Sequence, residues 1–419
     1  MKLTYKFKYT KKNKLLDDLC VISNNLYNQA NYLIKQESDI NNKWLRYNDL
    51  DKIMKVTKNR ENEINYRKLK VQISQQLLRL LDANWLCYFR ALKNFKKTPN
   101  KYKGMPKPPN YKKSNTKNLL IYTNQCSKIK NNQIILSKDI KIDIPKVDID
   151  FSKFQQIRVL PKNNFYEIEI IYNKERIDSN LDQNNYLSID LGIDNLITCI
   201  SKDKSFILSG KTIKSVNQHY NKQKVTINRF QSKKGYTSCS NKLNQLSQYR
   251  NDFIKDQFHK MSRLIVNYCL VKNISIITCG YNKNWKDSIS IGKINNQKFT
   301  AIPYRKFINY LKYKCELVGI KLIINEESYT SKCDSLALES IEKYNKYLGK
   351  RVHRGLFQSS VGKLINADVN GSFNILRKVI GDDSLFIKDL TNNVVLFNPI
   401  KIRTTQFNSQ TLLNSLIKK

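Results

Sequence analysis

The first half of the chain switches from a strand-like to a helix-like pattern of apolar and polar residues. Residues 2–9 (KLTYKFKY) alternate polar and apolar side chains, which predicts a β-strand. Between Leu15 and Ile34, and again between Leu77 and Leu92, apolar residues recur at helical spacing. We therefore predict a helical block over residues 13–98.

Residues 99–118 (PNKYKGMPKPPNYKKSNTKN) interrupt this pattern with proline and lysine. The prolines exclude a helix. Two interpretations remain open for this segment, a solvated linker or a basic arm whose tyrosines stack on nucleic-acid bases. Several short strand-like runs follow in residues 119–175 and predict a small barrel or sandwich. The first strand could join it, which would make the helical block an insertion.

The second half follows a different order of elements. Three short strands (YLSID, NLITCIS and SFILSG) precede a long polar helical stretch over about residues 212–272. A fourth strand (ISIITCG), a helix at 304–318, a fifth strand (GIKLIIN) and a final helix from about Asp368 come next. This order is typical of a ribonuclease-H-type α/β sheet. The sequence thus predicts a multidomain α+β protein.

The charge of the chain indicates a polyanionic partner. Lys and Arg number 75 against 34 Asp and Glu, which gives a formal net charge of +41. Codon bias explains abundant lysine but leaves the scarcity of acids unexplained. Such an excess repels itself in a compact protein unless a polyanion neutralises it, so nucleic acid is favoured over a membrane surface.

Other features of composition point to a reducing compartment. Nine cysteines show no CxxC pair and no disulfide-like spacing, and we expect neither a signal peptide nor a transmembrane run. A prokaryotic cytoplasm or nucleoid is therefore the expected location.

Three acidic residues lie where a strand ends or a helix begins. Asp190 closes YLSID, Glu327 follows the fifth strand, and Asp368 opens the last helix. Carboxylates from separate elements suit a site that holds two Mg²⁺ ions for phosphodiester hydrolysis. The alternatives are a strand-end turn residue for Asp190 and a helix cap for Asp368. Asp194, in the turn after the first strand, is interpreted as a turn residue.

Several basic residues are candidates for nucleic-acid contact. Arg250 lies on the long polar helical stretch, and Arg377 lies on the last helix, where it could instead favour the helix C-terminus. Lys350, Arg351 and Arg354 lie in a basic segment that could also be a solvated loop.

Several motifs together resemble one family, the transposon-encoded RNA-guided nuclease TnpB, which is related to miniature type V CRISPR effectors. The motifs are DLGIDNLIT, YNKNWK, NNQKF, YTSKC, GKRVHRGLF and NADVNGSFNILRK, with weaker similarity in ISNNLYNQANYLIKQ, LLRLLDANWLCYFRALK and PKPPNYK. The resemblance implies a RuvC nuclease domain that cuts DNA selected by a guide RNA and a short adjacent motif.

The resemblance also implies a domain plan. A wedge β-barrel is expected from residues 1–12 and 119–180, and a helical recognition lobe with its basic arm from 13–118. The RuvC domain is expected from 181–330 and 366–381, with a ribbon-like insert at 331–365 and a tail at 382–419.

The chain departs from the family pattern in two places. Most relatives carry the middle catalytic Glu at the end of the fourth strand, where this chain has Gly280. We expect Glu327, on the adjacent strand, to replace it, with Glu326 as its competitor. Most relatives also have a four-cysteine zinc ribbon, whereas the 331–365 segment offers only Cys333. We therefore expect no zinc there.

The sequence thus predicts a Mg²⁺-dependent, RNA-guided DNA endonuclease, monomeric with its RNA, in which Asp190, Glu327 and Asp368 hold the metal ions. The alternatives are an RNA-guided DNA-binding repressor with an impaired nuclease and, less favoured, a transposase that joins DNA ends itself.

Overall fold

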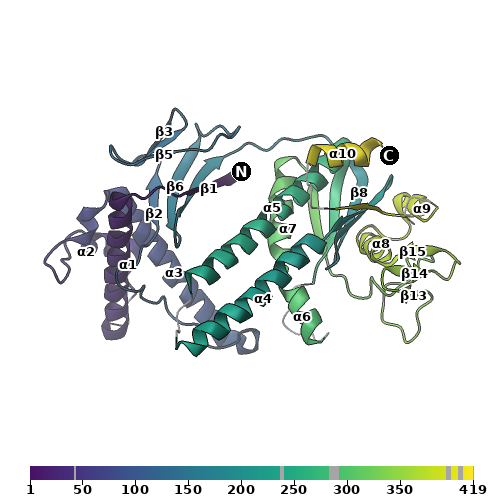
Figure 1. The fold of residues 1–419 in the computed structure, drawn as a ribbon, viewed down its shortest axis with the longest axis horizontal. Coiled ribbons are helices and arrows are strands. Elements are labelled where there is room, and N and C mark those ends of the chain that lie inside the picture. Colours follow the sequence, from purple (N-terminus) through teal and green to yellow (C-terminus); the bar gives the residue numbers. More distant parts are fainter. Residues whose placement is uncertain (42–43, 236–239, 283–291, 393–397, 404–408, 419) are drawn as a thin grey trace. The chain divides into compact units, whose positions relative to one another are not determined.

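The structure is a computed structural model that describes residues 1–41, 44–235, 240–282, 292–392, 398–403 and 409–418. The chain forms two compact units, Met1–Lys174 and Glu175–Lys419, which are described separately. Figure 1 labels their helices and strands. Most of the YNKNWK motif lies outside the described residues.

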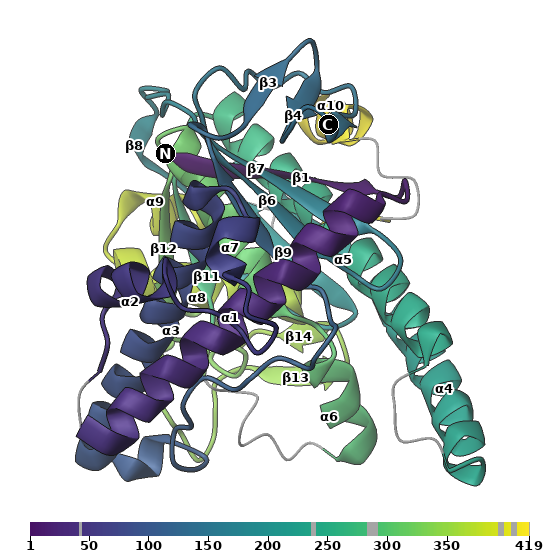
Figure 2. The ribbon, with the colours of Figure 1, turned by 90° about the vertical axis from the view of Figure 1, so that its left-hand side faces the viewer.

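A four-stranded antiparallel sheet organises the first unit. Its order is β1 (Lys2–Tyr9), β7 (Tyr166–Asn173), β6 (Phe154–Pro161) and β2 (Leu120–Thr123) (Figure 2). The strand predicted at residues 2–9 is confirmed. Along β1 the three lysines and Thr4 are exposed and the other residues are half-buried, because alternate side chains point to opposite faces. Lys6 pairs with Glu169, its register partner on β7.

A second, smaller sheet contributes to the same hydrophobic core. It comprises β3 (Lys128–Lys130), β4 (Gln133–Ile135) and β5 (Lys141–Asp143), all antiparallel. Ile134 and Ile142, from β4 and β5, are fully buried with side chains of the larger sheet. The described strand pairings give two sheets, and their closure into a barrel stays a prediction.

The residues predicted to be helical, 13–98, form the helices that cover the core of the first unit. They are α1 (Lys14–Asn41), α2 (Tyr47–Met54) and α3 (Val71–Lys97), with short 3₁₀ turns at Asn65–Lys68 and Pro99–Lys101. The apolar faces predicted from helical spacing are buried, as shown by Leu26 on α1 and Leu78 on α3.

The second half of the basic arm is fixed along α1. Asn24, Asn28 and Asn31 lie on one face of that helix, and their amides donate to the carbonyls of Lys113, Lys112 and Pro109 at 2.8, 2.9 and 3.1 Å. These bonds satisfy backbone groups that a loop otherwise leaves to water. Residues 109–113 are therefore an anchored extended segment rather than a free linker.

A six-stranded mixed sheet forms the centre of the second unit. Its order is β12 (Lys321–Asn325), β11 (Ile274–Gly280), β8 (Asp182–Leu191), β9 (Asn195–Ser201), β10 (Ser205–Ser209) and β16 (Ile400–Ile402). The pairs β8–β9 and β9–β10 are antiparallel, whereas β11, β12 and β16 join in parallel. The predicted order of elements from residue 186 to the last helix is present.

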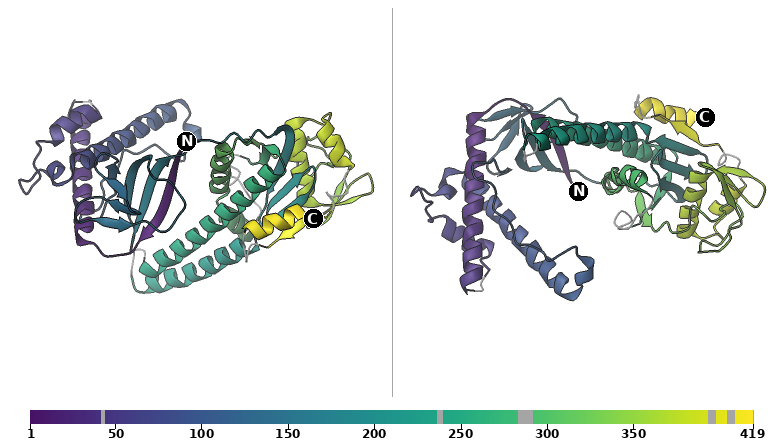
Figure 3. Two further views of the ribbon diagram at one scale, coloured as in Figure 1. Left: turned by 90° about the horizontal axis from the view of Figure 1, so that it is seen from above. Right: turned by 60° about the horizontal axis from the view of Figure 1, so that its bottom comes forward.

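Helices cover both faces of this sheet (Figure 1). On one face α5 (Asn241–Val271) and α7 (Tyr304–Leu317) bury the core that contains Phe258 and Phe307. On the other, α8 (Ala367–Ile380) and α9 (Leu385–Thr391) pack with Phe373 and Ile387. The long polar stretch is a helical hairpin of α4 (Lys211–Lys233) and α5, which lie side by side in Figure 3. A short helix, α6 (Lys293–Thr300), precedes α7.

The predicted ribbon-like insert contains a small antiparallel sheet. Its strands are β13 (Lys350–His353), β14 (Leu356–Gln358) and β15 (Leu364–Asn366). Because β15 leads directly into α8, this small sheet fixes the point at which that helix starts.

The segment 382–419, expected to be a tail, forms packed elements in the parts that the structure describes. Strand β16 pairs with the edge strand β10, and α10 (Ser409–Lys418) packs on α5. Leu413 and Leu416 are buried in the main core, and buried Lys204 donates from Nζ to the Leu416 carbonyl at 2.6 Å. This role could not be predicted from the sequence because β16 has only three residues, too few to show an alternation of polar and apolar side chains.

None of the helices among the described residues is both long and apolar enough to cross a membrane.

Packing of α10 can be tested with Leu416→Ala. Leu416 is fully buried, so its truncation should lower the free energy of unfolding by about 2–5 kcal/mol in a urea titration. The matched control is Leu385→Ala, because Leu385 is 78% exposed and its loss should change stability by no more than about 0.5 kcal/mol. Equal effects of the two substitutions would contradict the packing of α10.

Candidate active site

Asp190 lies at the sheet edge where β8 ends. It is paired in register with Thr198 on β9. Helix α8 passes very close to it because residue 371 is glycine: a Cβ at Gly371 would lie 3.3 Å from Asp190 Oδ2. The missing side chain thus lets the helix backbone approach the carboxylate.

Asp368 lies in the first turn of α8, but it does not cap the helix. Asn366 is the N-cap residue, and its side chain accepts from the backbone N–H groups of Asp368 and Val369 at 3.0 and 3.3 Å. The helix-cap alternative for Asp368 is therefore wrong. Its carboxylate instead accepts a 2.6 Å hydrogen bond from Asn195 Nδ2 and lies 3.8 Å from the Arg351 guanidinium.

The Glu327 carboxylate lies beside Gly280, the last residue of β11. Strands β11 and β12 are parallel, with Gly280 beside Asn325. Two residues further on, the Glu327 carboxylate turns back: a Cβ at Gly280 would lie 2.8 Å from Glu327 Oε2. Asn282 fixes this turn by accepting from the Glu327 backbone N–H at 2.9 Å. The carboxylate thus fills space that a side chain at residue 280 would need.

Glu326 faces a different environment. It is exposed, and its carboxylate accepts from Ser328 Oγ at 2.5 Å. Adjacent residues of an extended segment point to opposite sides. Of the two glutamates, Glu327 is the one whose charge raises the pKa of Asp190. The geometry therefore favours Glu327 over Glu326 as the third acid.

Burial, more than neighbouring charge, raises the pKa values of Asp190 and Glu327. Burial, and then the negative charges of Glu327 and Asp368, raise the pKa of Asp190 well above its usual range. Burial raises the pKa of Glu327 to about 7, against the opposing effect of Lys378. Partly buried carboxylates that share a region destabilise each other's charged forms. A cation placed among them would relieve this cost.

The donor set is the kind that Mg²⁺ prefers, because all three groups are carboxylates. However, no group of three or more His, Cys, Asp or Glu side chains in the described part of the chain is arranged to hold a metal ion. The three acids therefore face a common region without converging into a ligand set.

Basic residues of the insert surround this region. Arg351 (β13) is half exposed beside Asp368, and Arg354, 80% exposed, binds Asp194 at 2.7 Å. Asp194 also binds Lys214 at 2.5 Å, which agrees with its interpretation as a turn residue. Lys350 is exposed on β13. All three basic residues stay candidates for nucleic-acid contact.

Arg250 was predicted to contact nucleic acid, and the structure gives it another role. Its guanidinium donates to Asn217 Oδ1 at 2.6 Å, to Asn251 Oδ1 at 3.2 Å and to the Ala301 carbonyl at 2.7 Å. These bonds tie α4 and α5 to the end of α6. The guanidinium thus links three helices within the protein, and its contact with nucleic acid stays a prediction.

Arg377 was also predicted to contact nucleic acid, and the structure corrects this prediction. Its side chain is buried and donates to both oxygens of Asp382 at 2.7 and 2.8 Å, to Asn374 Oδ1 at 2.7 Å and to the Glu339 carbonyl at 3.0 Å. It therefore cannot reach a phosphate without breaking a buried network. Asp382 and Glu339 lie outside the helical spacing of α8, so these two partners could not be read from charge alone.

Further residues, which were not predicted from the sequence, hold the acids in place. Tyr304 donates to the Gly192 carbonyl at 2.8 Å, in the turn after Asp190. Burial, and then Asp190 and Glu327, raise the pKa of this tyrosine. The spacing of Asn366, Asn370 and Asn374 at every fourth residue was a signal that could have been found, since it places three amides along one face of a helix.

Two family models match parts of the chain. Residues 169–286 match the family described as OrfB_IS605, probable transposase. Residues 304–375 match the Cas12f1-like TNB domain. The first segment contains Asp190 and Gly280, and the second contains Glu327 and Asp368. The TnpB-like resemblance is thus supported over these two segments.

Solved structures show a shared fold. The chain is 16% identical to that of a Cas12f1–sgRNA–target DNA complex, with a TM-score of 0.55 over 86% of this chain and 82% of that one. The chain of the mini-RNA-guided endonuclease Cas_phi3 is 9% identical, with 95% and 93% covered and a TM-score of 0.46. The shared mixed α+β fold rests on the first match. A search of curated proteins found no match.

The raised pKa of Glu327 predicts a pH-dependent stability difference. Its folded-state pKa of about 7 lies above the ordinary 4.5, so its contribution to stability is fully present below pH 4.5 and is lost as the pH rises through 7. In metal-free buffer, Glu327→Gln should therefore exceed the parent protein in unfolding free energy by roughly 1–3 kcal/mol above pH 7. The difference should shrink towards zero below pH 4.5.

The measurement is a series of urea titrations between pH 4 and 8. Glu326→Gln is the matched control, because that residue is exposed one position away. Parallel pH profiles for parent and Glu327→Gln would show that the Glu327 carboxyl titrates normally.

Proposed function

We propose that this protein is an RNA-guided DNA endonuclease of a transposable element, with a RuvC-type, ribonuclease-H-like site. Asp190, Glu327 and Asp368 would hold two Mg²⁺ ions. The observation that supports this most directly is the Glu327 carboxylate over Gly280, since it supplies an acid beside Asp190 where the chain otherwise lacks one.

Bound Mg²⁺ would activate water for attack on the DNA phosphodiester and stabilise the leaving oxygen. The residues supply the electrostatic conditions for binding these ions. Burial of both groups, and the negative charges beside Asp190, raise the pKa values of Asp190 and Glu327, so binding of a divalent cation would release protons from them. Arg351 would leave Asp368 as that charge is neutralised, and could then contact a phosphate.

The remaining parts of the chain suit nucleic-acid binding. The net charge of +41 matches a protein that holds both a guide RNA and duplex DNA. The Cas12f1 chain with the same fold was solved with sgRNA and target DNA. We propose residues 1–12 and 119–180 as a wedge, 13–118 as a recognition lobe with its basic arm, and 181–330 with 366–381 as the nuclease domain. Lys350, Arg351 and Arg354 of the insert would contact phosphates.

A second candidate is an RNA-guided DNA-binding repressor whose nuclease is impaired. The observation that favours it is the lack of a convergent metal-ligand group in the described part of the chain, together with glycine at residue 280. A transposase that itself joins DNA ends is less favoured, although one matching family is described as a probable transposase.

Three variants test the proposed site. Protein purified from cells should carry a discrete RNA, identified by sequencing, and cut DNA matching that RNA when Mg²⁺ is present. Asp190→Ala, Glu327→Ala and Asp368→Ala should each slow cleavage on the order of a thousandfold, because each removes a metal ligand. DNA binding should persist. Glu326→Gln, the neighbouring control, should cut at the parent rate.

Binding without cutting by the parent protein would favour the repressor. Strand transfer in the absence of RNA would favour the transposase, and random cellular RNA would count against a guide.

An acid moved to residue 280 should replace Glu327. The Glu327→Ala substitution removes the carboxylate that lies beside Gly280. A Cβ at residue 280 would still lie 2.5 Å from Ile375 Cδ1, so Ile375 must be shortened as well. The triple variant Gly280→Glu/Ile375→Val/Glu327→Ala should therefore cut DNA at least about tenfold faster than Glu327→Ala. Gly280→Gln in the same background is the control, since it matches the shape without the charge. Equal rates for the Glu and Gln versions would exclude a role for an acid at this location.

A further inference from the structure

One helix contacts the surroundings of all three acids. Helix α8 carries Asp368 in its first turn, and its Gly371 lies against Asp190. Ile375, one turn further on, lies against Gly280, over which the Glu327 carboxylate is placed. These residues follow each other at three- and four-residue intervals and so share one face of the helix.

Two further side chains of α8 hold the backbone around Glu327. Lys378 Nζ donates to the carbonyls of Glu326 and Ser328, at 3.3 and 2.7 Å, on either side of that residue. Asn374 Nδ2 donates to the Thr330 carbonyl at 2.8 Å. Thr330 in turn donates to the Glu327 carbonyl from Oγ1 at 2.8 Å and from its backbone N–H at 3.3 Å.

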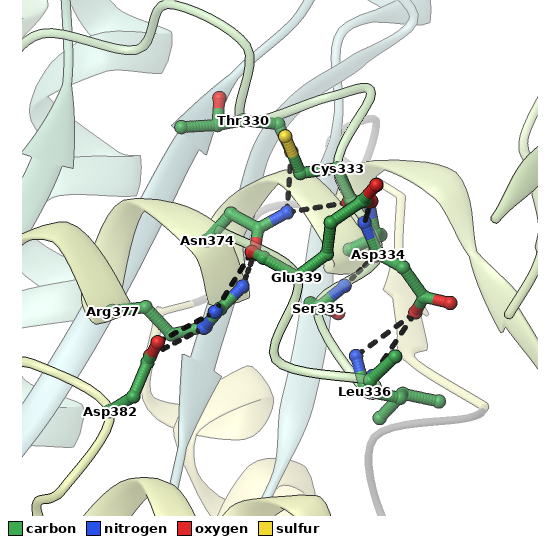
Figure 4. Close-up of polar contacts among 11 residues, drawn as sticks. Thr330, Cys333, Asp334, Ser335, Leu336, Glu339, Asn374, Arg377 and Asp382 are labelled. Carbon is green, nitrogen blue, oxygen red and sulfur yellow. Dashed lines mark hydrogen bonds and ion pairs between the residues drawn. The ribbon is translucent and has the colours of Figure 1, made fainter. Parts of the chain in front are cut away.

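The orientation of the Asn374 amide is fixed by its neighbours (Figure 4). Arg377 donates to Asn374 Oδ1 at 2.7 Å, so the amide nitrogen must face the other way, towards the carbonyls of Thr330 and Cys333, each at 2.8 Å. Asp382 binds the Arg377 guanidinium through both oxygens. A planar guanidinium held at all three nitrogens has little freedom to turn.

The loop beyond Cys333 is held just as firmly. Asp334 is fully buried, and its carboxylate accepts from the Ser359 hydroxyl at 2.8 Å and from the Ser360 backbone N–H at 2.7 Å. Glu339 accepts from the backbone N–H groups of Asp334 and Leu348 at 2.7 and 2.8 Å. Buried carboxylates satisfied in this way stiffen the segment that contains them.

We propose that Asn374 and Lys378 are positioning residues that set the location of Glu327 relative to Asp368 and Asp190. This inference rests on the proposed function, because the position matters for metal binding. Helix α8 thus helps to place all three acids. It carries Asp368 on its own backbone, its Gly371 lies against Asp190, and Asn374 and Lys378 hold the loop that contains Glu327.

The sign of a change in metal affinity separates positioning from simple electrostatics. Lys378→Met removes a positive charge near the acids, so Coulomb's law alone predicts tighter cation binding. Loss of positioning predicts weaker binding, by about tenfold, as for other residues that orient metal ligands. Arg351→Met is the matched control, because it removes a charge beside Asp368 without touching the Glu327 backbone, and it should tighten binding.

The measurement uses Tb³⁺ as the probe, titrated into the full-length protein freed of nucleic acid and followed by luminescence. The buried Tyr304 lies near the carboxylates and can sensitise the ion. Asn374→Leu, similar in volume and uncharged, should also weaken Tb³⁺ binding by about tenfold. Its control is Asn228→Leu on the exposed face of α4, which should leave the affinity unchanged.

Hydrogen exchange of the metal-free protein gives a readout that does not depend on the proposed function. Lys378→Met and Asn374→Leu should both speed exchange of the amides at Glu327 and Thr330. Tighter Tb³⁺ binding by Lys378→Met, or unchanged exchange in both variants, would overturn the positioning role. If Tb³⁺ binds the parent and Asp190→Asn equally, the proposed metal site fails, and faster exchange would still support positioning of Glu327.

Discussion

The cost of holding the partly buried Asp190 carboxylate beside two other acids is the constraint that shapes the second unit. Asp190, Glu327 and Asp368 come from a strand, a loop and a helix, and nothing in their own chemistry favours bringing them together without a cation. The surrounding structure must therefore hold them by other means. It does so through close backbone approach at Gly371, the Asn366 cap, and side-chain bonds from α8 to the loop after β12. The apolar packing of α8 against Ile200 and Phe357 provides the rigid base for these contacts.

The order of elements and the ends of the main strands could be predicted from the sequence because they depend on local patterns. The strand at residues 2–9, the helical block and the succession from β8 to α8 all follow from the spacing of apolar residues. Asp190 and Asp368 were found because each lies at the boundary of such an element. These are properties of short segments, so one chain suffices to read them.

What could not be predicted depends on contacts between distant segments. The Glu327 carboxylate lies beside Gly280 because the register of β11 and β12 places Asn325 next to that glycine. The roles of Arg250 and Arg377 follow from partners on other elements. A positive charge on a helix looks the same in the sequence whether it faces solvent or a buried aspartate. The three residues of β16 carry too little pattern to identify an edge strand.

The position of β16 has a consequence for biosynthesis. All three acids have been synthesised by residue 368, yet the edge of β10 stays open until Ile400–Ile402 pair with it, and Lys204 lacks its acceptor until Leu416 is in place. A nascent chain on the ribosome therefore contains all three acids before β16 has been synthesised and can pair with β10. Strand pairing across nearly 200 residues is slow compared with local helix formation, so we expect the β10–β16 pair to form late in folding.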